Sequence, residues 1–379
     1  MKLSIITHVK HKFDNPHYYA YAPYVSEINL WLKSVDQVII VAPLETQDKT
    51  TIDCYYRHHY IEFMSVSSVE FTSIQSILQS ILLVPNIILK IYKAMKAADH
   101  IHVRCPGNMG LLGCLVQIFF PSKPKTAKYA GNWNPKSKQP WSYRLQKWIL
   151  SNTFLTKNMQ VLVYGEWPNQ TNNIKPFFTA TYSEKEFVEI FRHPEIGSGS
   201  QELKHEVLKF LYVGTLTKNK RPLLCLEVVQ QLKQQGYQVQ LELYGEGPER
   251  HEIENYILDY NLQEEVDLKG NVSKEELKSA YQSSHLLLFF SQSEGWPKAV
   301  AEAMFWGCVP ITTAVSCVPY MLGNGIRGTL VEADKSVIIA AVENYLNHPK
   351  IYKEHAQHAM DWSRQYTLEK FEEEIKKLL

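Results

Sequence analysis

The chain has 379 residues, of which 45% are hydrophobic and 21% charged, and its formal net charge is +1 at pH 7. This length favours two globular domains, and the balanced charge argues against a dedicated nucleic-acid-binding protein. Six scattered cysteines without a Cys-x-x-Cys pair argue against a disulfide framework or a zinc site and predict reduced, mostly buried thiols.

Basic and acidic side chains are distributed unevenly along the chain. Residues 1–190 carry 20 Lys and Arg against 13 Asp and Glu, so the remainder has an acidic excess. A basic first half suits a domain that rests on anionic lipid, although incidental surface charge explains the imbalance as well.

The chain opens directly into an apolar stretch, residues 2–7, that is too short for a signal peptide. We therefore expect a cytoplasmic protein, with peripheral contact at the inner face of the plasma membrane as an alternative. The most hydrophobic segment, residues 76–98, is interrupted by polar residues and a proline and ends in a basic stretch with Lys90, Lys93 and Lys96. We expect one or two helices packed on the first domain, with membrane contact through these lysines as the alternative.

Short apolar strands alternate with helical stretches in the first half of the chain. Strands are predicted at residues 3–7, 37–42, 100–104, 126–130 and 160–164, and helices at 24–34 and 145–150. This alternation predicts a parallel, doubly wound sheet, whose ligands lie at the carboxyl ends of the strands.

A polar stretch rich in Gly, Ser and Pro at residues 191–200 marks a linker or exposed loop. A second alternating set follows, with strands predicted at residues 208–213, 239–244, 266–268, 286–290 and 309–312. The chain ends in an amphipathic helix at residues 367–379. We therefore expect domains at residues 1–190 and 191–366, followed by this helix.

A strand, a short polar loop and a helix are predicted around Glu294 and Glu302, which stand eight residues apart. Pro297 can occupy the first helical position, and Gly307 lies where a left-handed cap would end the helix. A helix N-terminus attracts anions because its first N–H groups lack partners. Two carboxylates beside it could accept hydroxyl hydrogen bonds on both sides of a diphosphate, as a nucleotide sugar requires. Alternatively, both are ordinary surface glutamates.

A basic turn follows the first strand of the second set, which ends at Gly214. Its cations are Lys218, Lys220 and Arg221, which could neutralise diphosphate oxygens. The next strand ends in a glycine-containing turn that begins at Gly245, and such turns are weak indicators by themselves.

The segment around Glu294 resembles the retaining GT-B glycosyltransferases of family 4, also called glycosyl transferases group 1. Their signature is Glu-x7-Glu in a setting close to SxxEGFPxxxxEAMACGxPVV. The matching residues are Ser291, Glu294, Gly295, Trp296, Pro297, Glu302, Ala303, Met304, Gly307, Pro310 and Ile311. The resemblance implies two doubly wound Rossmann-like domains that face each other across a cleft. The first would bind the acceptor and the second the nucleotide sugar, and the helix at residues 367–379 would cross back to the first domain.

The resemblance also implies roles for single residues of the second domain. Lys220 falls on a family lysine that grips the diphosphate, whereas Thr215 replaces the family arginine. Either Lys218 or Arg221 compensates, or the phosphate site is weaker than usual. The implied catalytic residues are Lys220 and Glu294. The implied donor-binding residues are Gly214, Thr215, Lys220, Gly245, Val272, Glu294, Gly295, Trp296, Pro297 and Glu302.

Residues 99–104 resemble the family strand Asp-x-x-His-x-His in the first domain. His102 takes the first histidine position, and Arg104 replaces the second, which in relatives approaches the donor sugar. Both are acceptor-side candidates. Arg104 could bind an acidic acceptor or be a salt-bridged framework residue, and a histidine in the place of His102 is more often a core residue than a catalyst. A Gly-Gly turn of the family after the first strand is absent.

Retaining transfer of a hexose from a nucleoside-diphosphate sugar to a saccharide or lipid-linked acceptor is the activity that the resemblance implies. It would serve the synthesis of a surface polysaccharide or glycolipid. No Asp-x-Asp occurs, so no metal or cofactor is expected. Two alternatives stay open: a GT-B epimerase or phosphorylase, and a nucleotide-sugar-binding scaffold without transferase activity.

Overall fold

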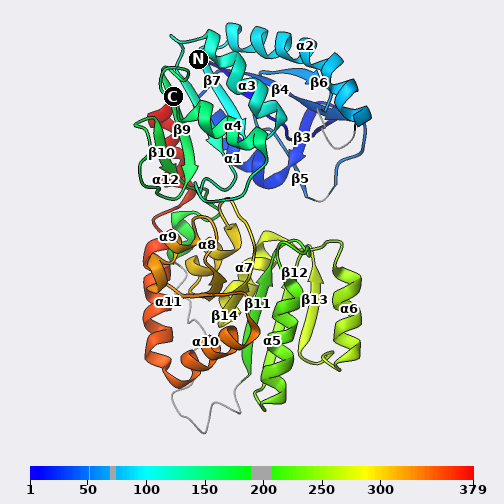
Figure 1. The fold of residues 1–379 in the computed structure, drawn as a ribbon, viewed down its shortest axis with the longest axis vertical. Helices are drawn as coiled ribbons and strands as arrows, with labels where there is room; N and C mark the ends of the chain where they lie inside the picture. The colour runs from blue at the N-terminus through cyan, green and yellow to red at the C-terminus, as the bar shows by residue number, and fades with distance from the viewer. Residues whose placement is uncertain (51, 69–73, 189–206) are drawn as a thin grey trace. The chain divides into compact units, whose positions relative to one another are not determined.

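The computed structural model describes residues 1–50, 52–68, 74–188 and 207–379, and the linker predicted at residues 191–200 lies outside them. The chain forms two compact units. Unit 1 comprises Met1–Ala180 and Glu369–Leu379, and unit 2 comprises Thr181–Leu368 (Figure 1).

Unit 1 is built on a ten-stranded sheet with the order β10-β9-β8-β7-β1-β4-β2-β3-β5, and β6 also pairs with β4. All five strands predicted for this half of the chain are confirmed, and β6 and β10 are additional. The parallel strands are β1 (Lys2–Ile6), β4 (Gln37–Glu45), β6 (Ile61–Val66), β7 (His100–Cys105), β8 (Lys125–Tyr129), β9 (Met159–Tyr164) and β10 (Ile174–Phe177).

An unpredicted hairpin follows β1, in the place where the family has its Gly-Gly turn. It consists of β2 (His11–Asp14) and β3 (His17–Tyr21), and β3 pairs in turn with β5 (Asp53–Tyr55). His11 is fully buried in it and its Nε2 lies 2.7 Å from the Tyr56 hydroxyl. A polar residue at such an inward position hides the alternation by which strands are recognised.

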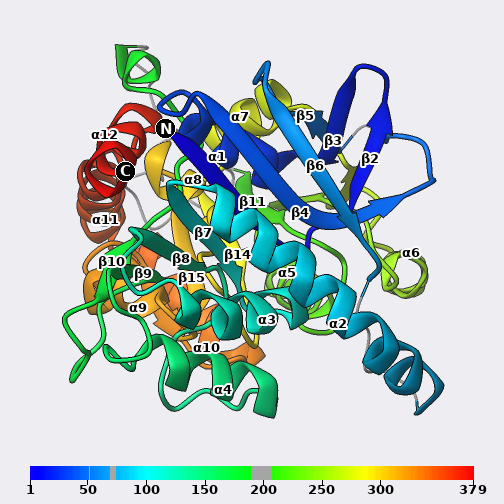
Figure 2. The same cartoon turned by 90° about the horizontal axis from the view of Figure 1, so that it is seen from above.

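The helices of unit 1 lie on both faces of the sheet. The predicted helices are confirmed as α1 (Ala22–Leu32) and α4 (Trp141–Leu150), and α3 (Asn108–Val116) lies between β7 and β8. The hydrophobic segment forms one helix, α2 (Ile74–Ala97), which contains Pro85. Helices α2, α3 and α4 pack side by side in one layer (Figure 2). No helix in the described ranges is long and apolar enough to cross a membrane.

The last helix of the chain, α12 (Leu368–Leu378), packs on unit 1. Phe371 is buried, with its ring centroid 5.3 Å from that of Phe177 and 5.6 Å from that of Phe178. Lys33, the residue just after α1, and Glu372 on α12 form an ion pair at 2.5 Å. The apolar face of the amphipathic pattern is therefore buried in unit 1.

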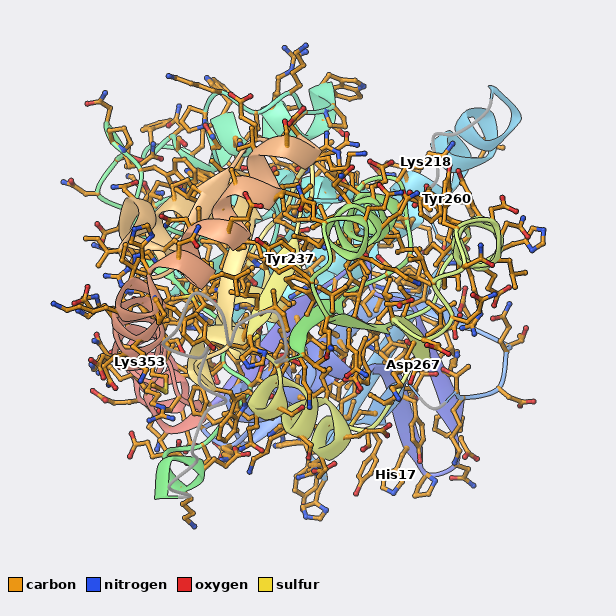
Figure 3. The ribbon with its side chains drawn as sticks, turned by 90° about the horizontal axis from the view of Figure 1, so that it is seen from below. His17, Lys218, Tyr237, Tyr260, Asp267 and Lys353 are labelled. Atoms are coloured by element: carbon orange, nitrogen blue, oxygen red, sulfur yellow. The ribbon has the colours of Figure 1, made fainter. Side chains whose placement is uncertain are left out.

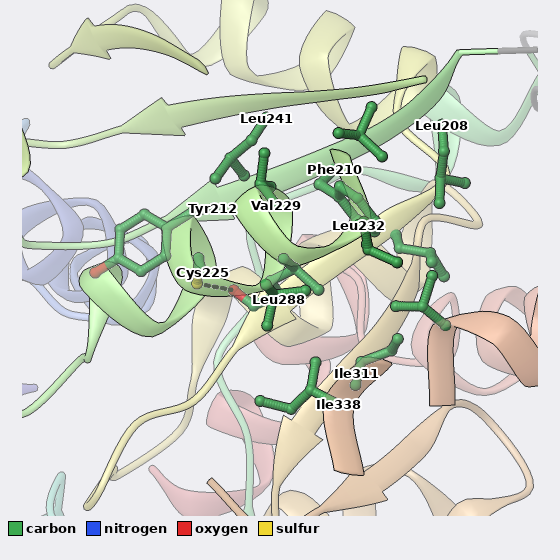
Figure 4. Close-up of a cluster of buried hydrophobic side chains, with 14 of the residues drawn as sticks. Leu208, Phe210, Tyr212, Cys225, Val229, Leu232, Leu241, Leu288, Ile311 and Ile338 are labelled. Carbon is green, nitrogen blue, oxygen red and sulfur yellow. Dashed lines mark hydrogen bonds between the residues drawn. The ribbon is translucent and has the colours of Figure 1, made fainter. Parts of the chain in front are cut away.

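Unit 2 has a six-stranded parallel sheet with the order β13-β12-β11-β14-β15-β16. The strands are β11 (Leu208–Val213), β12 (Val239–Tyr244), β13 (Val266–Gly270), β14 (Leu286–Phe289), β15 (Val309–Thr313) and β16 (Thr329–Val331). The five predicted strands are confirmed. Apolar side chains from the sheet and its helices form a continuous core that includes Phe210, Val229, Leu241, Leu288 and Ile311 (Figure 4).

Helices connect the strands of unit 2. They are α5 (Pro222–Gln234), α6 (Arg250–Asp259), α7 (Lys274–Ser283), α8 (Lys298–Phe305), α9 (Val318–Met321), α10 (Lys335–Asn347) and α11 (Pro349–Ser363). Both units are thus doubly wound α/β domains, which confirms the predicted fold class. Five of the six cysteines are buried, as expected.

Candidate functional site

The strand order of unit 2 reverses between β11 and β14, because β12 and β13 lie on one side of this pair and β15 and β16 on the other. In open parallel sheets, ligands bind outside the carboxyl ends of the strands at such a reversal. The loop after β11 contains Lys220, and the loop after β14 contains Glu294. The two predicted catalytic residues therefore meet at the position that the topology favours for a ligand.

Lys220 and Glu294 form an ion pair between Nζ and Oε1. The side chains are 21% and 10% exposed, so the pair is largely shielded but still reachable from solvent. The Lys220 ammonium also lies 5.2 Å from the centroid of the Phe289 ring. An ammonium and a carboxylate held together in this way can each turn to a ligand group of opposite charge or to a hydroxyl.

Asn219 joins the loop after β11 to the loop after β14 by hydrogen bonds. Its Nδ2 donates to the carbonyl of Ser293 at 3.2 Å, and its own carbonyl accepts from the Gln292 N–H at 2.8 Å. The Ser291 hydroxyl adds a bond to the Asn219 carbonyl at 3.3 Å. Lys220 directly follows Asn219, and Glu294 directly follows Ser293. The hydrogen bonds between the two loops therefore fix the distance between the backbones of Lys220 and Glu294. The sequence does not predict this role of Asn219, because an asparagine in a turn is common.

The other cations of the basic turn have different places. Arg221 adopts a left-handed conformation with φ 52° at the start of α5, and its Nη1 donates to the Phe290 carbonyl at 3.2 Å. It therefore acts as a brace between the loops. Lys218 is exposed (Figure 3), and so is Thr215. Lys218 is thus the more accessible candidate to replace the family arginine.

Three successive strand ends are joined by backbone hydrogen bonds. The Gly214 N–H donates to the Tyr244 carbonyl at 2.9 Å, and the Gly245 N–H to the Gly270 carbonyl at 2.8 Å. A Cβ on Gly245 would lie 2.0 Å from the Gly214 carbonyl oxygen, so only glycine fits there. Val272, the residue next but one after β13, is partly exposed. Gly214, Gly245 and Val272 thus lie at one edge of the sheet.

Helix α8 begins one residue later than predicted. Pro297 is its N-cap, with φ −73° and ψ 93°, because a residue with that ψ is outside the helical region. The N–H groups of Val300 and Ala301 bond to the Pro297 carbonyl, and no side chain caps the helix. The N–H groups of Lys298 and Ala299 therefore precede the first helical bonds, as the anion site requires. Gly307 has φ 79° just after the helix, as predicted.

The loop in front of α8 is held by the next loop along the sheet. The Gly295 carbonyl accepts from the Ser316 hydroxyl at 3.2 Å and from the Cys317 thiol at 3.1 Å. The side chain of Trp296 is buried, and its ring stacks on that of Trp362 at a centroid distance of 6.3 Å. Trp296 therefore anchors the loop to α11, and only its backbone is left to contact a ligand.

Glu302 lies on α8 and is bonded within unit 2. Its Oε1 accepts from the Thr181 hydroxyl at 2.7 Å, and its Oε2 from the Tyr281 hydroxyl at 3.1 Å. Burial raises the pKa of this carboxyl, and the Thr181 hydroxyl partly offsets the effect. A ribose hydroxyl would have to share these oxygens or displace a protein hydroxyl, and the donor-binding role of Glu302 stays a prediction.

The two acceptor-side candidates of unit 1 differ in environment. His102 on β7 is buried, and its Nδ1 lies 2.9 Å from the Thr126 hydroxyl. Burial lowers its pKa to about 3, so the ring is neutral at pH 7. These contacts are those of a core histidine, and its side chain offers nothing to an acceptor.

Arg104, near the carboxyl end of β7, lies beside a buried ion pair. Glu27 and Lys128 are 2.9 Å apart with side chains 9% and 1% exposed, whereas Arg104 Nη1 is 4.0 Å from Glu27. One carboxylate thus faces two cations, and it is closer to the lysine. The Arg104 guanidinium lies 4.7 Å from the Tyr24 ring centroid, and among the described residues its Nε has no hydrogen-bond partner. This excess of positive charge suits an anionic group better than a framework role alone.

A cluster of possible metal ligands is absent from the ranges that the structure describes. His, Cys, Asp and Glu side chains there form no group of three that could hold a metal ion.

Comparison with known proteins gives a match in unit 2. Residues 198–362 match the family model described as glycosyl transferases group 1. A putative colanic acid biosynthesis glycosyltransferase of Salmonella typhimurium is 28% identical over 140 residues, which cover 35% of this chain and 34% of that protein. The amylovoran biosynthesis glycosyltransferase of Erwinia amylovora is 28% identical over 144 residues, or 36% and 35% of the two chains. The matches span about a third of the length of these relatives.

Solved structures extend the likeness to the whole fold. A lipopolysaccharide outer core galactosyltransferase has a TM-score of 0.69 at 14% identity and covers 100% of this chain and 99% of its own. A protein of Anabaena, solved in complex with UDP and glucose, has a TM-score of 0.68 at 13% identity and covers 100% and 98%. At these identities the likeness shows the GT-B fold alone. Residues 198–362 are thus similar to the glycosyl transferases group 1 family, in a chain that has the GT-B fold of these solved structures.

Proposed function

We propose that this protein is a retaining glycosyltransferase that moves a hexose from a nucleoside-diphosphate sugar to a saccharide or lipid-linked saccharide acceptor. The observation that carries the proposal is the Lys220–Glu294 pair at the reversal of the unit 2 sheet, beside the uncapped end of α8. Relatives named for colanic acid and amylovoran biosynthesis support a place in surface polysaccharide or glycolipid synthesis.

The diphosphate would lie between Lys220 and the first N–H groups of α8. A phosphate oxygen attracts the ammonium of Lys220 away from Glu294, and the helix end adds the N–H groups of Lys298 and Ala299. These groups stabilise the negative charge that grows on the leaving diphosphate. Such preorganised donors act most strongly where charge develops in the transition state. Protein groups alone would supply this stabilisation, so the proposal includes no metal ion.

Glu294, once Lys220 turns to the diphosphate, would accept hydrogen bonds from sugar hydroxyls. Its backbone position is set by the bonds of Asn219 to Ser293 and of Ser316 to Gly295. Holding the sugar by its hydroxyls fixes the anomeric carbon relative to the acceptor, which lowers the entropy cost of the reaction. Glu294 is thus a positioning group, and its removal should lower turnover more than it lowers nucleotide affinity.

The transfer step exchanges one bond at the anomeric carbon. The acceptor oxygen forms a bond to this carbon on the face from which the diphosphate departs, and the carbon–oxygen bond to the diphosphate breaks. The acceptor proton passes to the departing phosphate oxygen. The anomeric configuration is therefore retained, and nuclear magnetic resonance of the first product formed reports it directly.

A panel of radiolabelled UDP- and GDP-sugars, each with and without a lipid extract, tests the proposal. We expect one donor to transfer its label to saccharide or lipid. Isomerised nucleotide sugar without transfer would indicate an epimerase, and label transfer to inorganic phosphate a phosphorylase. Nucleotide binding without turnover for any donor would indicate a scaffold, and each of these three results contradicts the proposal.

A further inference from the structure

Positive charge is concentrated in one continuous stretch of unit 1. Residues 74–165 contain 12 Lys and Arg but a single acidic residue, Asp99, although the whole chain is balanced at 40 against 39. Asp99 is itself engaged, because it accepts the Lys2 N–H at 2.7 Å. This stretch forms α2, α3, α4 and the strands between them.

Half of these cations point to solvent. Three others serve the fold, because Lys90, Lys123 and Lys147 donate to backbone carbonyls. Lys125 and Lys128 are buried, and Arg104 lies beside Glu27. The exposed cations are Lys93, Lys96, Lys136, Lys138, Arg144 and Lys157.

Large apolar side chains are exposed on the same elements. Each has 50–82% of its surface open to solvent, whereas such residues are usually buried. They are Leu82 and Leu89 on α2, Phe119 just after α3, Trp141 and Trp148 on α4, and Phe154 in the turn after α4. Exposed apolar groups interspersed with cations mark an interaction surface.

Helix α4 shows how the two kinds of side chain are combined. Trp141 and Trp148 are seven residues apart, and Arg144 lies three residues after the first and four before the second. All three therefore share one face of the helix. The opposite face is buried through Gln146 and Ile149. A stripe of two tryptophans around an arginine is typical of a helix at a membrane interface, where indole rings lie at headgroup level.

The right-handed crossovers of the sheet bring these elements to one side. Strands β6, β7, β8 and β9 follow one another in a single direction across the sheet, so α2, α3 and α4 cover the same face. The contacts of α2 with α3 and of α3 with α4 agree with this placement on one face of the sheet. Figure 2 shows the three helices in one layer.

We infer that the outer side of the α2–α3–α4 layer docks on an anionic lipid bilayer. The lysines and Arg144 lie over the headgroups, and the indole and leucine side chains enter the boundary with the acyl chains. Aliphatic groups such as Leu82 and Leu89 bury well in lipid, whereas a nucleic acid offers them little. This docking goes beyond the proposed function and does not depend on it.

Co-flotation of the full-length protein with phosphatidylcholine vesicles, prepared with and without phosphatidylglycerol, tests the inference. We expect binding to be at least about tenfold stronger on the anionic vesicles and to weaken as salt rises. The variant Arg144→Glu with Trp148→Ser should lose most of this binding. A matched control in unit 2 is Leu258→Ser with Lys350→Glu, whose residues are 60% exposed and 89% exposed in the side chain. The control should float like the wild type.

A second variant tests the same surface without changing a residue of α4. Lys136→Glu with Lys138→Glu changes only exposed residues of the loop before the helix, and it should weaken anionic binding several-fold while the circular dichroism spectrum is unchanged. Three results would overturn the inference: no flotation of the wild type, equal flotation with neutral vesicles, or wild-type flotation of both variants. A surface used by a protein partner would give the first.

Discussion

Lys220 and Glu294 are 74 residues apart in sequence and form an ion pair where the strand order of the unit 2 sheet reverses. Each lies in the loop that follows one of two adjacent parallel strands, and Asn219 joins those loops. The pair thus depends on the topology as well as on the two side chains, and this makes it a probe of the whole site.

Glu294→Gln should lower turnover by about 10²–10³-fold while donor affinity changes little. The amide keeps the shape and can still contact the loop, but it is a weaker acceptor for sugar hydroxyls than a carboxylate. Initial rates against donor concentration separate kcat from KM. Wild-type turnover in this variant, with an unchanged circular dichroism spectrum, would remove Glu294 from the site.

Lys218→Ala should raise the donor KM by about tenfold if this lysine replaces the family arginine, and the effect should shrink in high salt because the side chain is exposed. Lys350→Ala, a change of another exposed lysine in unit 2, is the matched control. Equal KM values for both variants would show that Lys218 does not contact the diphosphate.

Gly245→Ala should destabilise unit 2 by more than about 3 kcal/mol, because its Cβ would lie 2.0 Å from the Gly214 carbonyl oxygen. Gly236→Ala is the control, since its φ is 87° and nothing lies within 4 Å of an added Cβ. Gly236→Ala should lower the free energy of unfolding only by the cost of an alanine in the left-handed conformation, about 1–2 kcal/mol. Urea unfolding measures both, and equal losses would contradict the close approach of the two turns.

Glu27→Gln should destabilise the protein by about 3–5 kcal/mol, because it leaves Lys128 buried without its carboxylate. The pair of Lys33 and Glu372, whose side chains are 55% and 22% exposed, is the comparison, and Glu372→Gln should change the free energy of unfolding by less than about 1 kcal/mol. Similar values for the two variants would mean that the interior pair is not shielded from water.

Glu302 should make the stability of unit 2 depend on pH. Burial raises its pKa above the usual 4.5, so the folded state binds this proton more tightly than the unfolded state. The contribution of Glu302 to the free energy of unfolding is fully present below the pKa of the unfolded state. It is lost as the pH rises through the pKa of the folded state. The free energy of unfolding of the wild type, relative to Glu302→Gln, should therefore fall as the pH rises above the ordinary pKa of 4.5. A difference that is constant or rises would contradict the burial of this carboxyl.

Much of the fold could be predicted because the parallel strands are short segments rich in apolar residues. Strands β11 and β12 each contain polar residues as well (Lys209, Gln240 and Glu242), but each ends just before a glycine, and their bounds agree with the prediction. The hairpin β2–β3 was missed, since its inward positions include the polar His11. The sequence predicts one or two helices at residues 76–98, because a proline usually ends a helix, whereas Pro85 lies inside the single helix α2.

The residue types predict the two charged residues of the site, Lys220 and Glu294, but not the residues that hold their loops in place. A carboxylate and a lysine in turns after strands signal chemistry, and the structure brings Glu294 and Lys220 together. Asn219 and Cys317 support them through single hydrogen bonds to backbone carbonyls, which no local pattern reveals. Conversely, the burial of Trp296 follows from tertiary packing that the neighbouring sequence does not encode, whereas the predicted strand already allows a core position for His102.

Calorimetric titration of UDP and GDP into the wild type and Lys220→Met tests most directly whether the loops after β11 and β14 hold a nucleoside diphosphate. We predict that one nucleotide binds the wild type and that the variant, which keeps the length of the side chain without its charge, binds it at least about tenfold more weakly. Equal affinity of both proteins for that nucleotide would contradict the account.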